Sequence, residues 1–499
     1  MPAPRGSRNQ VQVHVAGPEG GNTCTMVHIF HIIMSGVMVP GPLHPVTVLE
    51  QCRISPSPAP AADQPRALPL TFFDLVFWDF PPVQRLFFYD NDDLLDVPDF
   101  QASELPQFKK SLAAALHHFY PLAGKLTCEL AEGAAPEIAF SDGDSVRLTL
   151  AVSGDDFHDL AGDHARDTAR LRHRVPRRRH LRGHHAVADG SSYVHFMKTW
   201  AAIHRSANNE CRKVVAVAPD VPPLFDRGVV RDDAGLREAF VSDHRDLAAA
   251  DDSRLGDWDL SRRPGVVLAT FRFTEKQLGM LGRHVESETS ARCSPNALAC
   301  GAAWAGIVHA RGTASSNDAC FGFVTGCKPR VSPPIPANYF GNCLGLCRVE
   351  APKQGGGGLN AAAVATAIWR VIAGLVEEGR AFRDARGWVR LVREYASRRA
   401  VTVAGSPKLG VYAVDFGDAW GRPRKVEIAS VERTGALALA ESGRDGDGGI
   451  EVGLALPRTE MEAFRAFYRD LFASLNGNSK TDHAARHHVN CITSHLLHL

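Results

Sequence analysis

The amino-acid sequence predicts an α+β protein built from two domains. Its 499 residues exceed what one ordinary hydrophobic core supports, so two domains of roughly 200 residues each are expected. Strand-like and helix-like segments both occur, but they do not alternate regularly as they do in a doubly wound fold. Apolar residues make up 44% of the chain and charged residues 22%, which is ordinary for a globular protein. No internal repeat stands out.

The first part of the chain contains a strand and a densely aromatic segment. Residues 1–45 are rich in glycine, proline and isolated polar residues, and they predict a loosely ordered extension. Residues 46–54 (VTVLEQCRI) alternate as a strand does, and a Pro/Ala-rich linker follows at 55–65. Residues 68–91 (LPLTFFDLVFWDFPPVQRLFFYDN) carry many aromatic side chains, which predicts a large buried apolar area.

Two amphipathic helices are expected next. Residues 103–126 have Ser103 as an N-cap and Pro121 as a stop, and residues 191–206 form the second helix. Their apolar faces carry Leu105, Phe108, Leu112 and Leu116 in the first helix, and Tyr193, Phe196, Met197, Trp200 and Ile203 in the second.

The second half begins after a charged, proline-punctuated segment between about residues 207 and 262, which predicts an inter-domain crossover. Thr274 and Gln277 have the spacing of a capping box, and Ser294 precedes a proline at the first helical position. We expect strands over 265–273, 320–326 and 448–457, helices over 274–285, 294–311, 359–379 and 459–475, and a polar, His-rich tail after the last helix.

Composition excludes several classes of function. The chain has 56 Lys and Arg against 55 Asp and Glu, so its overall charge gives no reason to expect nucleic acid or an anionic membrane as a partner. The 11 cysteines contain no CxxC pair, which argues against a disulfide framework and a zinc site and favours reduced thiols in a reducing compartment. Residues 26–40 are apolar but too short to span a bilayer. We therefore expect a cytoplasmic, monomeric enzyme or small-molecule binder without a bound metal.

The segment HHAVADG (184–190) carries the residues for acid–base chemistry. Histidine has the side-chain pKa closest to neutrality, so His185 can accept a proton from an alcohol and return it. Asp189 follows four residues later, and Gly190 permits a tight turn into the next helix. An isolated HxxxD pattern also occurs by chance in structural roles, so the pattern alone leaves both interpretations open.

The segment VYAVDFGDAWGRPRKVE (411–427) is the second notable stretch. A strand-like run ends in Asp415 and Phe416, and Gly417 and Gly421 frame Trp420. Taken alone, it is also compatible with a β-turn that packs one aromatic side chain.

In combination, the two segments resemble the two signatures of the BAHD acyl-CoA-dependent acyltransferases of plants, HxxxD and DFGWG. The aromatic stretch in 68–91 and HFYPLAGKL (118–126) fit the same family. So do NYFGNCLG (338–345), AGSPKLGVY (404–412) and GGIEVGLALP (448–457). The YFGNC run resembles the branch that acylates phenolic and anthocyanin glycosides, often with malonyl groups. The resemblance covers roughly residues 46 to 475.

This resemblance implies a fold and an activity. The fold would be two similarly built chloramphenicol-acetyltransferase-like domains, joined by a long crossover, with a channel between them. The activity would be O-acyl transfer in plant secondary metabolism, moving a malonyl or hydroxycinnamoyl group from acyl-CoA to a hydroxyl of a phenolic or flavonoid glycoside. The partners would be acyl-CoA as co-substrate and the small acceptor. The expected divisions are an extension at 1–45, the first domain at 46–225, the crossover at 226–262, the second domain at 263–475 and the tail at 476–499.

The resemblance also implies roles for individual residues. His185 would deprotonate the acceptor hydroxyl as it attacks the thioester carbonyl, in a direct ternary-complex reaction. Asp189 would be structural and paired with an arginine, for which Arg330 is the candidate. Further structural residues would be Asp415, Phe416, Gly417, Trp420 and Gly421, and the residues expected along the channel are His184, Gly190, Tyr339, Gly341, Asn342 and Ser406.

Three features depart from the family pattern. Asp418 and Ala419 are additional in the DFG…WG turn, and both ends of the chain are extended. In the family, a hydrophobic strand precedes the catalytic histidine, but here residues 170–183 (RLRHRVPRRRHLRG) contain seven arginines. Such a segment cannot be a buried strand, because burying unpaired arginines costs several kcal/mol each, to order of magnitude.

Alternative functions therefore remain open. A catalytically impaired family member could bind ligand without turnover, because the strand before His184 is missing. The arginine run could bind the phosphates of CoA or a nucleic acid, but a solvated basic loop explains it equally well in a neutral chain without interleaved aromatic residues.

Overall fold

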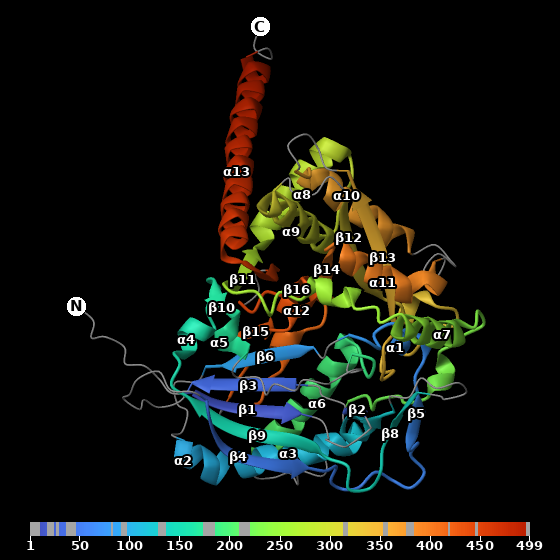
Figure 1. The fold of residues 1–499 in the computed structure, drawn as a ribbon. Helices are drawn as coiled ribbons and strands as arrows, with labels where there is room; N and C mark the ends of the chain where they lie inside the picture. The colour runs from blue at the N-terminus through green and yellow to red at the C-terminus, as the bar shows by residue number, and fades with distance from the viewer. Residues whose placement is uncertain are drawn as a thin grey trace.

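The computed structural model shows two large sheets, one above the other in Figure 1, with helices packed on each. The described residues are 10–16, 24–25, 29–35, 46–80, 83–90, 97–127, 136–172, 185–208, 220–312, 318–352, 358–375, 384–417, 420–444 and 448–495. The predicted α+β class is confirmed, because the helices and strands follow one another without regular alternation.

The lower sheet has six strands in the order β15-β6-β3-β1-β9-β4. Its central strands are antiparallel along β3, β1, β9 and β4, whereas β3 and β6 run parallel. The strands are β1 (Gln10–Ala16), β3 (Ile29–Ser35), β4 (Thr47–Ile54), β6 (Gln84–Tyr89), β9 (Val146–Ser153) and β15 (Lys425–Ile428).

The sequence predicts a loosely ordered extension over residues 1–45, but the structure contains strands β1 and β3 in this range. They lie between β9 and β6, so both of their edges are hydrogen-bonded within the sheet. Val13 and Val15 of β1 are 0% and 3% exposed and belong to the main hydrophobic core. The alternating QVQVHVA pattern is short, and neighbouring Gly- and Pro-rich sequence obscured it; pairing with distant strands determines its structure.

The upper sheet has seven strands in the order β10-β11-β17-β16-β14-β12-β13. It contains the three strands expected in the second half, and it buries a second core against α9, α10 and α13. Its strands are β10 (Arg166–Asp167), β11 (Val266–Phe273), β12 (Ala319–Gly326), β13 (Leu344–Ala351), β14 (Val401–Gly405), β16 (Ala436–Glu441) and β17 (Ile450–Pro457).

The two halves of the chain exchange strands. β10 comes from the first half but pairs with β11 of the upper sheet, whereas β15 comes from the second half and pairs with β6 of the lower sheet. A third, four-stranded sheet joins β2 (Cys24–Thr25), β7 (Lys125–Leu126), β8 (Glu137–Ala139) and β5 (Ala67–Pro69).

The helices follow their sequence signals closely in most places. The predicted capping box is present at the start of α8, where the Thr274 hydroxyl accepts from the Gln277 N–H, and the Ser294 side chain caps α9. The longer helices are α3 (Leu105–His118), α6 (Gly190–Asn208), α7 (Leu236–Ala249), α8 (Glu275–Thr289), α9 (Pro295–Arg311), α10 (Ala361–Gly374), α11 (Trp388–Ser397) and α13 (Arg458–His495). The short ones are α1 (Phe72–Leu75), α2 (Val97–Asp99), α4 (Phe157–Leu160), α5 (Thr168–Arg172) and α12 (Val431–Thr434).

The last helix is longer than predicted. α13 continues to His495, through the segment expected to be a polar tail, and it projects from the body of the molecule in Figure 1. Among the α13 residues whose side chains the structure describes, which end at 476, Leu475 is the last one in the second core. Among the described helices, none is both long and apolar enough to cross a bilayer.

Candidate active site

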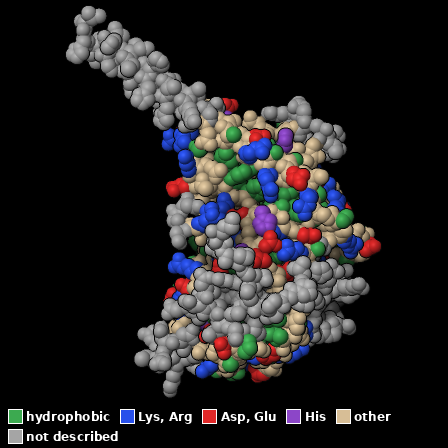
Figure 2. Space-filling view, turned by 90° about the vertical axis from the view of Figure 1, so that its left-hand side faces the viewer, with side chains coloured by type: hydrophobic (Ala, Val, Ile, Leu, Met, Phe, Trp, Pro, Cys, Tyr) green, Lys and Arg blue, Asp and Glu red, His purple; other side chains and the backbone are tan. Residues whose placement is uncertain are grey.

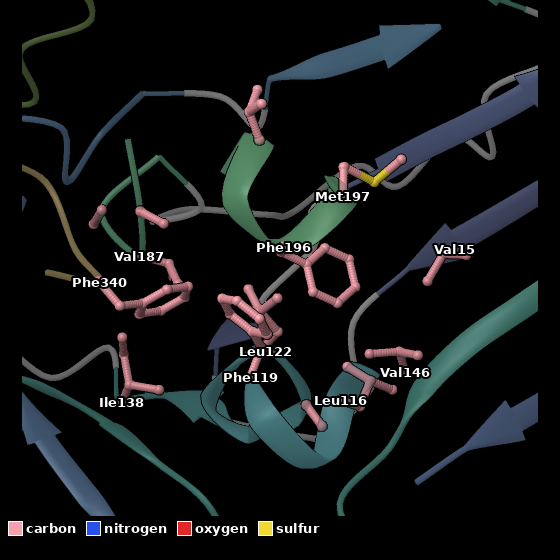
Figure 3. Packing of buried hydrophobic residues seen from close by; sticks show 14 of the residues in the cluster. Val15, Leu116, Phe119, Leu122, Ile138, Val146, Val187, Phe196, Met197 and Phe340 are labelled. Carbon is pink, nitrogen blue, oxygen red and sulfur yellow. The ribbon is translucent and has the colours of Figure 1, made fainter. Parts of the chain in front are cut away.

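The loop that carries His185 lies on the main hydrophobic core. Ala186 and Val187 are fully buried, and Asp189 immediately precedes α6. Figure 3 shows Val187 facing a cluster in which Phe119 and Leu122 meet Phe196 of α6. The side chains of Ala186, Val187 and Ala188 therefore pack into this core, which fixes the backbone of the loop.

The imidazole of His185 is enclosed by aromatic side chains. It stacks on the ring of Phe77, with ring centres 4.2 Å apart and an interplanar angle of 23°, and the ring of Phe80 approaches it edge-on at 6.2 Å. Burial lowers the pKa of His185, and the carboxylates of Asp189 and Asp74 oppose this shift. The side chain is therefore held as the neutral imidazole, which is the form that accepts a proton.

Asp189 anchors the start of α6 rather than facing an arginine. Its Oδ1 accepts hydrogen bonds from the N–H groups of Ser191 at 3.1 Å and Ser192 at 2.9 Å, and from the Ser191 hydroxyl at 2.7 Å. Its Oδ2 accepts from the Cys343 N–H at 3.4 Å. The expected pairing with Arg330 is wrong: the Arg330 guanidinium donates to the Gly326 carbonyl instead, because the helix N-terminus already satisfies the carboxylate.

A second carboxylate holds the other end of the loop. The Asn342 side-chain amide donates to the backbone carbonyl of His185 at 2.9 Å and to Asp74 Oδ1 at 3.0 Å. Asp74 Oδ1 also accepts from the Asn342 N–H at 3.0 Å, and Asp74 Oδ2 accepts from the N–H and hydroxyl of Thr71, each at 2.8 Å. Arg227 lies 3.8 Å from the same carboxylate. This buried network fixes the backbone at His185 from the side opposite Asp189.

A cavity of about 990 Å³ opens at His185 and runs between the two sheets. Of the residues expected along the channel, Gly190 and Ser406 line this cavity together with His185. Asp189 and Arg330, which were expected to be structural, also line it. Tyr339, Gly341 and Asn342 are not among its lining residues, and they lie behind the loop in the Asp74 network. His184, also expected along the channel, lies outside the described residues.

The turn that contains Asp415 lies away from the cavity. Asp415 Oδ1 accepts from the Gly417 N–H at 2.9 Å, and the Asp415 carbonyl accepts from Arg205 of α6 at 2.9 Å. Trp420 is 1% exposed and stacks on Phe108 of α3 with ring centres 4.9 Å apart. Of its described residues, which exclude the additional Asp418 and Ala419, none lines the cavity. The turn joins α3 to the C-terminal end of α6, and this placement supports an architectural role.

The sequence interpretation missed several residues of the site. Phe77, Phe80 and Arg85 line the cavity, and Asp74 positions the loop, although all four come from the aromatic stretch 68–91. The sequence did contain a signal for Asp74 and Arg85. Each is the one charged residue of its run, LTFFDL and VQRLFF, among mainly apolar side chains, where burial makes a charge costly.

The described side chains include no group of His, Cys, Asp and Glu residues arranged to hold a metal ion. The cysteines at the cavity wall, Cys343 and Cys347, are free thiols, and burial raises the pKa of Cys347 to about 12. A thiol with a raised pKa is a poor nucleophile at neutral pH, so His185 is the group at this site with the chemistry of a base.

Comparison with known proteins places this site in a family. Residues 44–138 and 182–470 match the model of the Transferase family. The malonyl-CoA:anthocyanidin 5-O-glucoside-6''-O-malonyltransferase of Arabidopsis thaliana is 31% identical over 463 residues, which cover 85% of this chain and 97% of that protein. Phenolic glucoside malonyltransferase 1 of Arabidopsis thaliana is 29% identical over 466 residues, which cover 83% of this chain and 95% of that protein.

A solved structure supports the fold. The crystal structure of vinorine synthase aligns with a TM-score of 0.50 at 16% identity, covering 84% of this chain and 96% of that chain. With the matches in sequence across both sheets, this chain belongs to the Transferase family of BAHD proteins and is an acyl-CoA-dependent O-acyltransferase.

Proposed function

We propose that this protein transfers a malonyl or hydroxycinnamoyl group from CoA to a sugar hydroxyl of a phenolic or flavonoid glycoside, with His185 as the general base. The observation that carries the proposal is the half-buried imidazole of His185, stacked on Phe77 at the wall of the 990 Å³ cavity. Relatives that share about 30% of their residues with this chain are named as malonyl- and coumaroyltransferases acting on anthocyanin or phenolic glucosides.

The reaction proceeds in one active-site complex. The imidazole of His185 accepts the proton of the acceptor hydroxyl while the hydroxyl oxygen attacks the thioester carbonyl carbon. The tetrahedral intermediate then collapses, the C–S bond breaks, and the thiolate of CoA leaves with the proton that His185 returns. Asp189 and the pair Asp74–Asn342 hold the loop in place, so that His185 is already positioned before the reaction begins.

Turnover of matched donors and acceptors tests the proposal. Purified protein is incubated with malonyl-CoA or p-coumaroyl-CoA and a flavonoid glucoside, and free thiol and acylated glucoside are measured together. We expect equal amounts of both products. His185→Ala is expected to reduce the rate by about 100- to 10,000-fold, which is the usual contribution of a general base. His164→Ala is the control, because His164 is a half-exposed histidine that pairs with Asp159 at 2.9 Å, away from the cavity.

A catalytically impaired protein would give a different result. Acyl-CoA would bind, as measured by calorimetry, but no thiol would be released with any donor. Strands β1 and β3 favour turnover over this alternative, because they fill the centre of the lower sheet even though residues 170–183 are too basic to form a buried strand.

A further inference from the structure

Arg85 is a buried cation at the cavity wall that the mechanism above does not use. It is the second residue of β6, it is 6% exposed, and it lines the same cavity as His185. Its Nη1 has no hydrogen-bond partner within the part of the chain that the structure describes. A buried guanidinium stays protonated, so an unused donor in an apolar chamber is costly unless a ligand engages it.

The surroundings of Arg85 are largely apolar or aromatic. Its guanidinium lies 5.2 Å from the ring centre of Tyr193, and Phe80 and Val83 are among the other residues that line the cavity. Glu441 is the carboxylate whose charge acts on Arg85. Glu441 Oε1 accepts from the Tyr412 N–H at 2.9 Å, and no ion pair between Arg85 and Glu441 within 4.0 Å is found.

Arg85 is linked to the loop of His185 through Tyr193 of α6, and it lines the same cavity as His185. The Tyr193 ring beneath the guanidinium belongs to α6, and the Tyr193 N–H donates to the Asp189 carbonyl at 3.1 Å. Phe80, which lines the same cavity, contacts the imidazole of His185. An acyl group whose thioester carbonyl lies at His185 can therefore extend toward Arg85 along the cavity wall.

We propose that Arg85 determines the choice of acyl donor by binding the free carboxylate of a dicarboxylic acyl group, as in malonyl-CoA. This inference rests on the proposed function and selects one of its two donor classes. A carboxylate accepts two parallel hydrogen bonds from a guanidinium, and the pair is strong where water is excluded. A neutral acyl group would leave the buried cation without its partner.

The other basic side chains at the cavity are less suited to this task. Lys328 already donates to the Tyr339 carbonyl at 2.8 Å, the Ala337 carbonyl at 3.0 Å and the Ser191 hydroxyl at 3.3 Å, which uses its three donors. Arg330 donates to the Gly326 carbonyl. Lys408 is exposed, so water screens its charge.

The test compares two donors of nearly equal shape. Isovaleryl-CoA has two methyl groups where malonyl-CoA has two carboxylate oxygens, so the pair differs mainly in charge. We expect wild-type protein to use malonyl-CoA with a kcat/KM at least tenfold higher than isovaleryl-CoA. Arg85→Met is expected to lower kcat/KM for malonyl-CoA by about 10- to 100-fold, the loss typical of a hydrogen bond to a charged group, and to change that for isovaleryl-CoA by less than about threefold. Lys408→Met is the matched control, with an unchanged ratio between the two donors.

Several results would overturn the assignment. One is a wild-type protein that uses both donors equally or prefers p-coumaroyl-CoA, and this result needs no variant to fold. Another is an equal loss for both donors in Arg85→Met. If no donor is turned over, the proposed function fails. The calorimetric affinities of the His185→Ala protein for malonyl-CoA and isovaleryl-CoA then decide separately whether Arg85 recognises the carboxylate.

Discussion

The environment of His185 sets the pH range in which the enzyme works. Burial against Phe77 and Phe80 lowers the pKa of this imidazole from its ordinary value of 6.5, so the proton leaves at a lower pH than it does in water. The base is active when neutral, and its activity is therefore lost only as the pH falls through the lowered pKa. We expect the acidic limb of kcat/KM to lie below pH 6.5. A steady-state pH profile with this limb above 7 would contradict the burial of the imidazole.

Substitution of Asn342 tests how the positioning of His185 contributes to catalysis, separately from the chemistry of its imidazole. Asn342→Ala removes the hydrogen bond to the His185 carbonyl and one of those to Asp74, while the imidazole itself is retained. We expect kcat to fall by about tenfold or more and the free energy of unfolding by about 1–3 kcal/mol, because a buried acceptor loses its donor. KM for the donor should change little, since Asn342 does not line the cavity.

A nearby asparagine gives the control for that experiment. Asn338→Ala removes a hydrogen bond of 2.7 Å to the Pro222 carbonyl in the same segment, and it leaves the contacts of His185 intact. An equal fall in kcat for both variants would show that the segment, and not the bond to His185, matters for catalysis. Unfolding by urea, followed by fluorescence, reports the stability of each protein.

At the scale of elements, strands β1 and β3 can be removed together by truncating the chain. Each pairs with strands on both sides, so without them β6 and β9 would face each other across two missing strands. A protein that begins at Pro45 would expose these strand edges and part of the core around Val13 and Val15. We expect it to aggregate or to unfold at a temperature lower by more than about 10 °C, because edges and core are lost together.

A truncation at the other end is the control. A protein that ends at residue 476 retains every described α13 side chain of the second core, including Leu475, and it is expected to keep its melting temperature within a few degrees. Calorimetric scans of the three proteins compare them. A stable, active protein without residues 1–44 would contradict the central position of β1 and β3.

The sequence predicts helices and their caps better than it predicts which distant residues or strands pair with one another. The capping signals of α8 and α9 are local, and both caps are where the residues indicate. The Asp189 and Arg330 pairing failed because sequence does not show that Ser191 and Ser192 supply the donors first. The β1 strand was missed because its alternation spans few residues, and its pairing with β3 and with β9, which is distant in sequence, makes it a strand.

At the scale of the whole molecule, charges are mixed rather than segregated. Figure 2 shows Lys and Arg interspersed with Asp and Glu among the described residues of one face, in keeping with 56 basic and 55 acidic side chains in the chain. The predicted α+β class is confirmed, but no sequence pattern indicated that β10 and β15 would cross between the sheets, because strand exchange depends on contacts between distant segments.

The exchanged strands carry a buried ion pair that ties the two sheets together. Arg166 lies on β10 of the upper sheet and Glu427 on β15 of the lower sheet, and the Arg166 Nη1 donates to Glu427 Oε2 at 2.9 Å within a two-pronged contact. Their side chains are 0% and 4% exposed. Removing one partner leaves an uncompensated charge where water cannot reach, so Arg166→Met is expected to lower the free energy of unfolding by about 3–5 kcal/mol.

A double-mutant cycle distinguishes the pair from general damage. Glu427→Leu alone should also cost about 3–5 kcal/mol, whereas the double variant Arg166→Met/Glu427→Leu should recover most of the loss, because no buried charge then lacks a partner. Arg424→Met is the matched control: Arg424 pairs with Asp90 at 2.9 Å between the same halves, but its side chain is 57% exposed, so a change below about 1 kcal/mol is expected. Urea unfolding of the wild type and the four variants measures these differences. Because each half contributes a strand to the other's sheet, the wild type should unfold in a single transition, and two separated transitions would show that the exchanged strands do not couple the halves.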